Sequence, residues 1–313
     1  MDQHEQSRWI QAKALELGFS DCGFAQAGPV SGDQVDFFAH WLAKNRHAEM
    51  AYMASNISLR LNPQLLEPDC LSVVVVLASH ELPNTIQRKA PFIAKYAHFP
   101  DYHYVLKDRL NQLLRSIQAE DSFASGRAFT DSAPILERYW AVQAGLGWIG
   151  KNRMLLSKKL GSYQWIGILL LNRKLDYAHP IESACGNCTR CLDACPGKAL
   201  DIREGLDANR CLSYLTIEKR GDFSEQEKDL VSANEWLFGC DICQMVCPWN
   251  RFSSAHNTHD LIPYDHMEAN EWMHITQLSN KQFERKFAQS SLLRTGAKGL
   301  RRNWESIKKR RNL

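Results

Sequence analysis

Eight of the ten cysteines in this chain have spacings that are typical of iron–sulfur ligation. Residues 185–196 read CGNCTRCLDACP, the C-x2-C-x2-C-x3-C-P order of bacterial ferredoxins. Residues 240–248 read CDICQMVCP, which lacks one cysteine of that order, and Cys211 lies 29 residues upstream of Cys240. Two-residue gaps let three thiolates of one tight loop reach one 4Fe–4S cluster. The pattern predicts two such clusters and a path for electrons.

The last cysteine of each run is expected to bind the neighbouring cluster, as it does in two-cluster ferredoxins. This rule uses all eight thiolates. The first cluster receives Cys185, Cys188, Cys191 and Cys247, and the second receives Cys195, Cys211, Cys240 and Cys243. Cys22 and Cys70 remain and are predicted to be core residues.

Structural zinc and disulfides are the alternative uses of clustered cysteines. Zinc needs four ligands, which two C-x2-C pairs could supply, but the C-x3-C-P endings and the total of eight favour clusters. The N-terminus, MDQHEQSRWIQAKALELGF, has no apolar segment of a signal peptide, and the longest apolar run, at 71–78, is too short to cross a bilayer. We therefore expect a cytoplasmic chain without membrane contact, in which disulfides are disfavoured.

The segment FTDSAPILER at 129–138 contains two carboxylates, Asp131 and Glu137, ahead of an expected helix at 133–145. A plain role for Asp131 is to cap that helix, with Pro134 in the first turn and Gly145 as its C-terminal stop. The alternative is a proton donor, which needs burial to raise the pKa of the aspartate. Tyr102 and His103, at the start of another expected helix, could line a cofactor pocket or simply pack.

The segment GLGWIG at 145–150 matches the G-x-G-x-x-G pattern of dinucleotide-binding proteins, and Lys151 follows it. Such a site requires a preceding strand and an acidic residue about 20 positions later. A helix is expected before this segment, and residues 164–171 are apolar. We therefore reject a nucleotide site, and expect the glycines to end a helix or to allow the backbone close to a flat ligand.

The C-terminal end of the chain is strongly basic. Residues 281–313 hold eleven Lys and Arg against two acidic residues, a local charge of +9, so the other 280 residues sum to 3 − 9 = −6. Such an end favours contact with phosphates. The alternative is a solvated helix. Replacement of the four consecutive cations 308–311 by alanine would separate these interpretations.

The elements that must position these groups form three segments. Residues 1–175 contain expected helices at about 5–18, 35–45 and 101–118, and expected strands at 21–25, 71–79 and 163–172, which predicts an α+β domain. Residues 176–255 are rich in cysteine, with short helices that metal would hold together. Residues 256–313 are expected to be helical and to end in the basic tail.

Five sequence blocks together resemble the epoxyqueuosine reductase family: DSAPILER, AGLGWIGKN, CGNCTRCLDACPGKAL, CLSYLTIEKRG and CDICQMVCPWN. The resemblance covers most of residues 5–255. It implies an oxidoreductase, related to reductive dehalogenases, that reduces epoxyqueuosine to queuosine at the wobble position of tRNA. It also implies an N-terminal nitroreductase-like domain that binds base-off cobalamin, followed by a double-cluster ferredoxin-like domain.

The resemblance places Asp131 at the position of the family's proton donor. It further implies contacts to the corrinoid from Tyr96, His103, Lys151, Asn152 and Ser213. The expected partners are tRNA and an external electron donor, and we expect a monomer. Two other functions fit part of the sequence: a two-cluster electron carrier that serves a partner reductase, and a tRNA-binding protein with structural clusters.

Overall fold

The computed structural model describes residues 1–83, 90–253 and 274–311. Its N-terminal part is built on a four-stranded antiparallel sheet in the order β1-β2-β7-β4. The strands are β1 (Asp21–Gln26), β2 (Ser72–Ser79), β7 (Gln164–Leu171) and β4 (Gly126–Phe129). The first three confirm the predicted strands, whereas β4 was not predicted, because it has four residues and pairs only with β7 at the edge.

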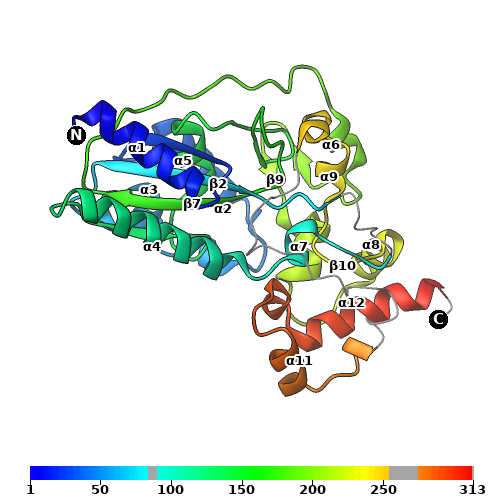
Figure 1. The fold of residues 1–313 in the computed structure, drawn as a ribbon. Coiled ribbons are helices and arrows are strands. Elements are labelled where there is room, and N and C mark those ends of the chain that lie inside the picture. Colours follow the sequence, from blue (N-terminus) through cyan, green and yellow to red (C-terminus); the bar gives the residue numbers. More distant parts are fainter. Residues whose placement is uncertain (84–89, 254–273, 312–313) are drawn as a thin grey trace.

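Both faces of this sheet are covered, which explains why β2 and β7 are apolar without interruption. Residues 74, 76 and 78 of β2 pack in one core cluster with residues of α1 (Gln3–Glu16) and α4 (Tyr102–Glu120). Residues 73, 75 and 77 pack in another with α5 (Glu137–Gln143) (Figure 1). Successive side chains of a strand point to opposite faces, so a strand between two helical layers has no polar side.

One glycine of β7 is needed for the close approach of α4. A Cβ atom at Gly167 would lie 2.9 Å from a methyl carbon of Leu110 and 2.9 Å from one of Val76. Any side chain here would push α4 away from the sheet.

The remaining helices of this part are α2 (Gly32–Ala43) and α3 (Ile57–Leu61), and a hairpin joins β5 (Trp148–Ile149) to β6 (Leu155–Leu156).

The helix expected at 133–145 begins later than predicted. The segment before Glu137 is irregular, because Ala133 precedes a proline, which disfavours helical backbone there. The role of Asp131 as a helix cap is therefore wrong: Leu136 holds the cap position and makes no side-chain capping bond. The predicted stop is confirmed, since Gly145 has φ of +70° directly after the last turn.

The cysteine-rich segment consists of short elements. Helices α6 and α9 pack side by side, and β10 pairs in parallel with β3 of the N-terminal part. The sheet pairing thus joins this segment to the first domain. The elements are β3 (Phe92–Ile93), α6 (Arg190–Ala194), β8 (Leu200–Asp201), β9 (Gly205–Leu206), α7 (Leu212–Ile217), α8 (Glu225–Asn234), β10 (Trp236–Phe238) and α9 (Ile242–Met245).

The basic C-terminal end is not a helix solvated on all sides. It forms α11 (Asn280–Lys286) and α12 (Gly296–Arg311), whose apolar side chains share a core cluster with α7 and β10. Leu300, Trp304 and Ile307 are buried in it. The side chains of residues 309–313 lie outside the described part of the chain.

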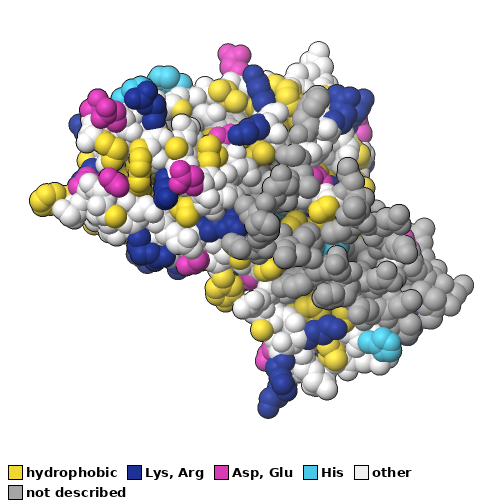
Figure 2. Space-filling view, in the orientation of Figure 1, with side chains coloured by type: hydrophobic (Ala, Val, Ile, Leu, Met, Phe, Trp, Pro, Cys, Tyr) yellow, Lys and Arg dark blue, Asp and Glu magenta, His cyan; other side chains and the backbone are white. Residues whose placement is uncertain are grey.

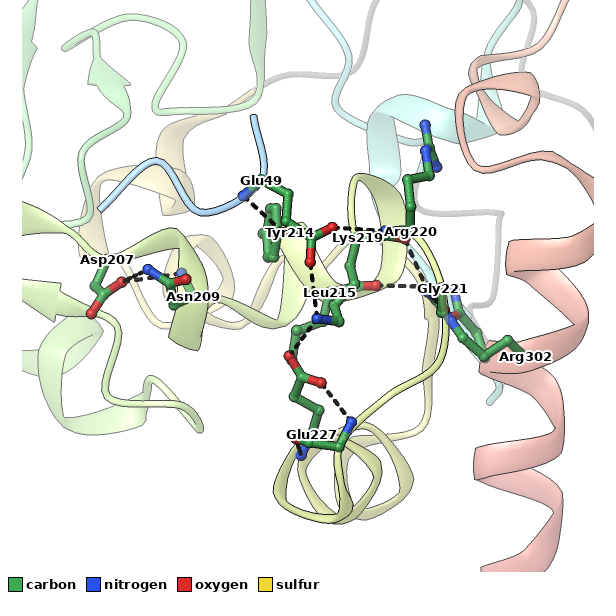
Figure 3. Close-up of polar contacts among 12 residues, drawn as sticks. Glu49, Asp207, Asn209, Tyr214, Leu215, Lys219, Arg220, Gly221, Glu227 and Arg302 are labelled. Carbon is green, nitrogen blue, oxygen red and sulfur yellow. Dashed lines mark hydrogen bonds and ion pairs between the residues drawn. The ribbon is translucent and has the colours of Figure 1, made fainter. Parts of the chain in front are cut away.

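Polar contacts also fix α12. The Arg302 guanidinium donates to the carbonyl oxygens of Lys219 at 2.9 Å and Gly221 at 2.7 Å, in the loop that follows α7 (Figure 3). Lys219 in turn lies 3.2 Å from a carboxylate oxygen of Glu49 and 3.2 Å from one of Glu227. This network links α12, the cysteine-rich segment and the N-terminal part, so Arg302 serves the fold.

We expect Trp304→Ala to destabilise the protein by about 3–5 kcal/mol, the usual cost when a buried tryptophan is truncated. Trp304 is 5% exposed and packs within the core cluster that includes α7. Urea unfolding of the cluster-loaded protein, followed by far-ultraviolet circular dichroism, measures the change. Glu305→Ala, at the exposed neighbouring position, is the control; equal midpoints for both variants would contradict the burial of α12.

We propose the predicted division into segments 1–175, 176–255 and 256–313 as the domain organisation. The first core cluster ends at Leu175, which supports the first boundary. The second boundary lies outside the described residues, and the helices beyond it share their core with the cysteine-rich segment. Within the described ranges, none of the helices is long and apolar enough to span a membrane.

Candidate active site and cluster-binding cysteines

The first set of four cysteines surrounds one cavity. The cavity has a volume of about 270 Å³, and Cys185, Cys188, Cys191 and Cys247 all line it. Burial, followed by the nearby thiols of Cys247 and Cys185, raises the pKa of Cys191. Three thiols of one loop and one from the distant second motif thus meet, which is the arrangement that the crossover rule predicts.

The second set is more deeply enclosed. Burial is the main cause that raises the pKa of Cys211, Cys240 and Cys243, and each of these three thiols also senses Cys195. Cys195 ends α6 and Cys211 precedes α7. The lone upstream cysteine therefore lies near the other thiols of the second set, and its role as a ligand of that set stays a prediction.

The donor chemistry of both sets fits 4Fe–4S clusters. Each offers four thiols and needs no other ligand, and a cluster would stabilise the thiolates that burial disfavours. Among the residues described, no three His, Cys, Asp or Glu side chains are arranged around a single metal ion. The two cysteines left over, Cys22 and Cys70, are buried in the two core clusters of the N-terminal sheet.

The segment after the false nucleotide motif lies at the first cavity. Lys151 and Asn152 both line it, from the turn between β5 and β6. The Lys151 ammonium donates to the carbonyl oxygens of Gly186 at 2.7 Å and Cys188 at 3.0 Å. Lys151 thereby holds the loop that carries three of the four thiols.

Polar side chains, among them Tyr102 and His103, surround Asp131 in the N-terminal domain, and we call this group the Asp131 cluster. The Tyr102 hydroxyl donates to Asp131 Oδ2 at 2.5 Å, and His103 Nε2 lies 3.6 Å from the same oxygen. The Asp131 side chain is 61% exposed, so a substrate can reach it. Its backbone has φ of +50°, a left-handed conformation that Asp and Asn adopt more readily than most residues.

The pKa of Asp131 shifts in the opposite direction to the one expected from burial alone, which would raise it. The protein atoms around the accessible Asp131 carboxyl partly displace water and oppose its ionisation, but hydrogen bonds from His103 and Tyr102 outweigh this effect, so the pKa of Asp131 is lowered rather than raised. Protons reside instead on its neighbours. Burial and the Asp131 charge raise the pKa of Glu137 to about 8, and bonds to Asp101 and Asp131 overcome burial to raise the pKa of His103 to about 9.

Aromatic rings line the base of the Asp131 cluster. The Tyr102 ring stacks on Trp165 with centroids 5.4 Å apart, and Tyr96 meets Tyr102 edge to face at 6.2 Å. From the sequence, Trp165 is only an apolar strand residue; its contact, near the start of β7, with the first residue of α4 is a tertiary feature. Asp101, whose carboxylate bonds His103 at 2.6 Å, was also missed, although it directly precedes Tyr102 at the start of the predicted helix.

Tyr96 connects the Asp131 cluster to the second set of cysteines. Its ring centroid lies 6.1 Å from that of Phe238, two residues before Cys240. Ser213, on the first turn of α7, follows Cys211 by two residues. The structure thus brings together Tyr96, His103 and Asp131, places Ser213 beside the second set, and places Lys151 and Asn152 beside the first.

Comparison with known proteins agrees with this arrangement. A family model described as "4Fe-4S double cluster binding domain" matches residues 184–250, and one described as "Epoxyqueuosine reductase QueG, DUF1730" matches residues 60–132. The epoxyqueuosine reductase of Cyclobacterium marinum is 40% identical over 302 residues, covering 96% of each chain. This chain belongs to the epoxyqueuosine reductase family.

Solved structures of epoxyqueuosine reductases share the fold over nearly all of the chain. That of the Streptococcus thermophilus enzyme matches with a TM-score of 0.86 and 29% identity, over 96% of this chain and 80% of that one. A structure with an epoxyqueuosine-modified tRNA-Tyr stem loop matches with a TM-score of 0.85 and 25% identity, over 97% and 81%. A reductive dehalogenase shares the fold at 14% identity, with a TM-score of 0.51 over 98% of this chain and 38% of that one. The expected α+β architecture with a double-cluster domain is confirmed.

Proposed function

We propose that this protein reduces epoxyqueuosine to queuosine at the wobble position of tRNA. The observation that carries the proposal is one chain with two four-cysteine sets, the second of which is connected to an accessible group of proton-bearing side chains around Asp131. The Asp131 carboxylate is 61% exposed, and Tyr96 connects its cluster with the second cysteine set. Membership of the epoxyqueuosine reductase family supplies the substrate.

The reaction requires both parts of the molecule. Removal of the epoxide oxygen breaks two C–O bonds and leaves a C=C bond, which consumes two electrons and two protons and releases one water. Each 4Fe–4S cluster carries one electron at a time, so two clusters suit a two-electron reduction. The electrons come from an external donor, and the protons must be supplied beside the departing oxygen.

Half-buried aromatic side chains beside the acid cluster fit a flat ligand, which agrees with cobalamin as the group that contacts the substrate. We infer that Tyr96 and His103 face it from the N-terminal domain, and Ser213 from the cysteine-rich one. Cobalamin, when bound, supplies a cobalt centre that accepts electrons and reduces the substrate. The contacts from Tyr102 through Tyr96 to Phe238 lead to the second cysteine set, so we infer that electrons pass from this set to cobalamin.

We infer that Asp131 delivers the proton and that its neighbours replenish it. Asp131 is ionised in this arrangement, whereas His103 and Glu137 are protonated at neutral pH, as the directions of their pKa shifts indicate. An oxyanion that develops beside Asp131 would raise the carboxylate's proton affinity and draw a proton onto it from His103. The Tyr102 hydroxyl, 2.5 Å from the carboxylate, fixes its orientation. A positioned acid of this kind contributes about 10²–10⁴-fold to a rate.

One experiment tests the function against an electron carrier. The chain is purified anaerobically, loaded with iron, sulfide and cobalamin, and incubated with a low-potential reductant and tRNA that carries epoxyqueuosine. Mass spectrometry of the nucleosides should show the loss of one oxygen atom per modified base. Clusters that load and cycle without binding cobalamin or converting the base would overturn the proposal in favour of the carrier.

We further propose that exposed cations of the C-terminal helices contact tRNA. Lys298 and Arg301 are exposed on α12, although Arg301 also donates to the carbonyl oxygen of Leu278 at 3.3 Å. Arg302 is less exposed and is committed to backbone carbonyls. On the face drawn in Figure 2, basic and acidic side chains of the N-terminal domain are interspersed. The +9 charge of residues 281–313 makes this end a candidate for phosphate contacts.

Replacement of Lys298, Arg301 and Lys308 by alanine should weaken tRNA binding and flatten its salt dependence. Each phosphate that the protein no longer neutralises reduces the slope of log K against log salt by about one unit. Filter binding between low and physiological salt measures both quantities.

A variant with three cations removed elsewhere, Arg8, Lys13 and Lys174 in and near α1, is the matched control. It lowers the net charge equally and should leave the slope unchanged. If both triple variants show the same slope of log K against log salt, the C-terminal cations do not contact tRNA, and their role is structural or they are only solvated.

A further inference from the structure

Asn152 lines the cavity of the first four cysteines and has a buried amide nitrogen without a hydrogen-bond partner in the described structure. The residue is 5% exposed, its Nδ2 atom is inaccessible to water, and no acceptor within the described structure bonds it. Asn152 also lines the cavity of about 270 Å³ together with all four thiols. Buried donors are nearly always paired in folded proteins, so this amide calls for an acceptor that the protein chain does not supply.

The orientation of the amide is set by its other end. Asn152 Oδ1 accepts the backbone N–H of Met154 at 3.2 Å, within the turn between β5 and β6. This bond assigns the oxygen and leaves the nitrogen on the remaining side of the group. Two other polar side chains of the cavity are already committed, since Lys151 and Trp249 donate to backbone carbonyls.

We infer that Asn152 Nδ2 donates a hydrogen bond to a sulfur of the first cluster and thereby raises its reduction potential. The inference rests on the proposed ligation by Cys185, Cys188, Cys191 and Cys247. A cluster held by four thiolates is anionic and gains one further negative charge on reduction. A donor aimed at its sulfur stabilises the reduced state more than the oxidised state, and hydrogen bonds to the sulfurs are among the features that set cluster potentials.

The consequence is a division of roles between the two clusters. The first lies farther from the Asp131 cluster along the chain of contacts through Tyr96 and Phe238, so it is the entry point for electrons. A raised potential lets it take electrons from a weaker external donor. Asn152 is in this sense a positioning residue for electron entry, without contact to the substrate.

Asn152→Ser tests the hydrogen bond. Serine retains a short oxygen that can accept from Met154 N but has no amide to reach the cluster. In a redox titration of the fully loaded protein followed by electron paramagnetic resonance, reduction of the first cluster should become about tenfold less favourable, which is ~59 mV for a one-electron couple. The second cluster is the internal control and should keep its potential. Asn152→Asp, which replaces the donor by a charged acceptor, should lower the first potential further.

The outcomes separate this inference from the function itself. A variant that holds about eight irons, the content of two 4Fe–4S clusters, and shows an unchanged first potential overturns the role of Asn152. Failure of the wild-type chain to bind clusters overturns the proposed function instead.

If Asn152→Ser does not load, pulsed resonance on an otherwise native chain decides the question. Asparagine labelled with ¹⁵N at its side-chain amide should show coupling to the reduced first cluster. The measurement is made in an Asn187→Ser chain, so that the loop asparagine next to Cys188 contributes nothing. Absence of coupling there contradicts the inference.

Discussion

Asp131→Asn should bind cobalamin and both clusters normally and convert epoxyqueuosine about 10²–10⁴-fold more slowly than the wild type. Asparagine has nearly the same shape, tolerates the φ of +50° at this position, and can still accept the hydroxyl of Tyr102. It has no carboxyl proton to transfer. The single-turnover rate of the loaded enzyme isolates this loss from effects on binding.

Asp33→Asn, at an exposed position of α2, controls for the loss of one negative charge. Near-normal conversion by a fully loaded Asp131→Asn enzyme would eliminate the proton-delivery role and transfer it to Glu137. The wild-type rate provides a second measurement. Because the pKa of His103 is raised to about 9, His103 is protonated below that pH, and the rate should fall as the pH rises through it.

Cys247→Ser should reduce the iron content from about eight to about four per chain, one 4Fe–4S cluster instead of two, and abolish turnover. Cys247 supplies the fourth thiol of the cavity that Cys185, Cys188 and Cys191 line, so its loss should release the first cluster and leave the second. The electron path is then broken at its entry. Iron analysis and the resonance spectrum of the reduced protein measure which cluster remains.

Double variants test the crossover without reference to spectra. Cys247→Ser combined with Cys191→Ser should lose no more iron than either alone, because both thiols belong to one cluster. Cys247→Ser combined with Cys243→Ser should lose nearly all. Cys70→Ser, in a core without other cysteines, should keep the iron of both clusters. Additive losses in the first pair, and a loss of only one cluster in the second, would refute the assignment.

The cysteine sets show how far spacing alone carries a prediction. Ligand loops are local, so C-x2-C gaps place thiols together wherever the chain goes. The crossover is long-range, but it follows from the similarity of the two runs, each of which ends in C-x3-C-P. Helix α6 packs beside α9. This packing brings Cys195, from the first run, near the thiols of the second set, and Cys247, from the second run, near those of the first set.

The sequence pattern predicted the buried strands of the N-terminal sheet, but it did not predict the buried face of the C-terminal helix. The apolar runs at 73–78 in β2 and 165–171 in β7 predicted strands buried on both faces, because only such strands lack a polar side. In α12 the high charge concealed the core face, since Leu300, Trp304 and Ile307 are few among many cations. Burial there depends on partners from α7 and β10, which no local pattern reveals.

By itself the sequence determined the main strands of the N-terminal sheet and, through its resemblance, the family, and it predicted the grouping of the cysteines. The charge state of the acid cluster was decided by tertiary structure alone. Asp131 and Glu137 are neighbours in sequence, but Tyr102 and His103 belong to α4, a separate element earlier in the chain, and lower the pKa of one acid while burial raises that of the other. Hydrogen bonds and burial at such a site depend on which surfaces meet, and that is a property of the folded chain.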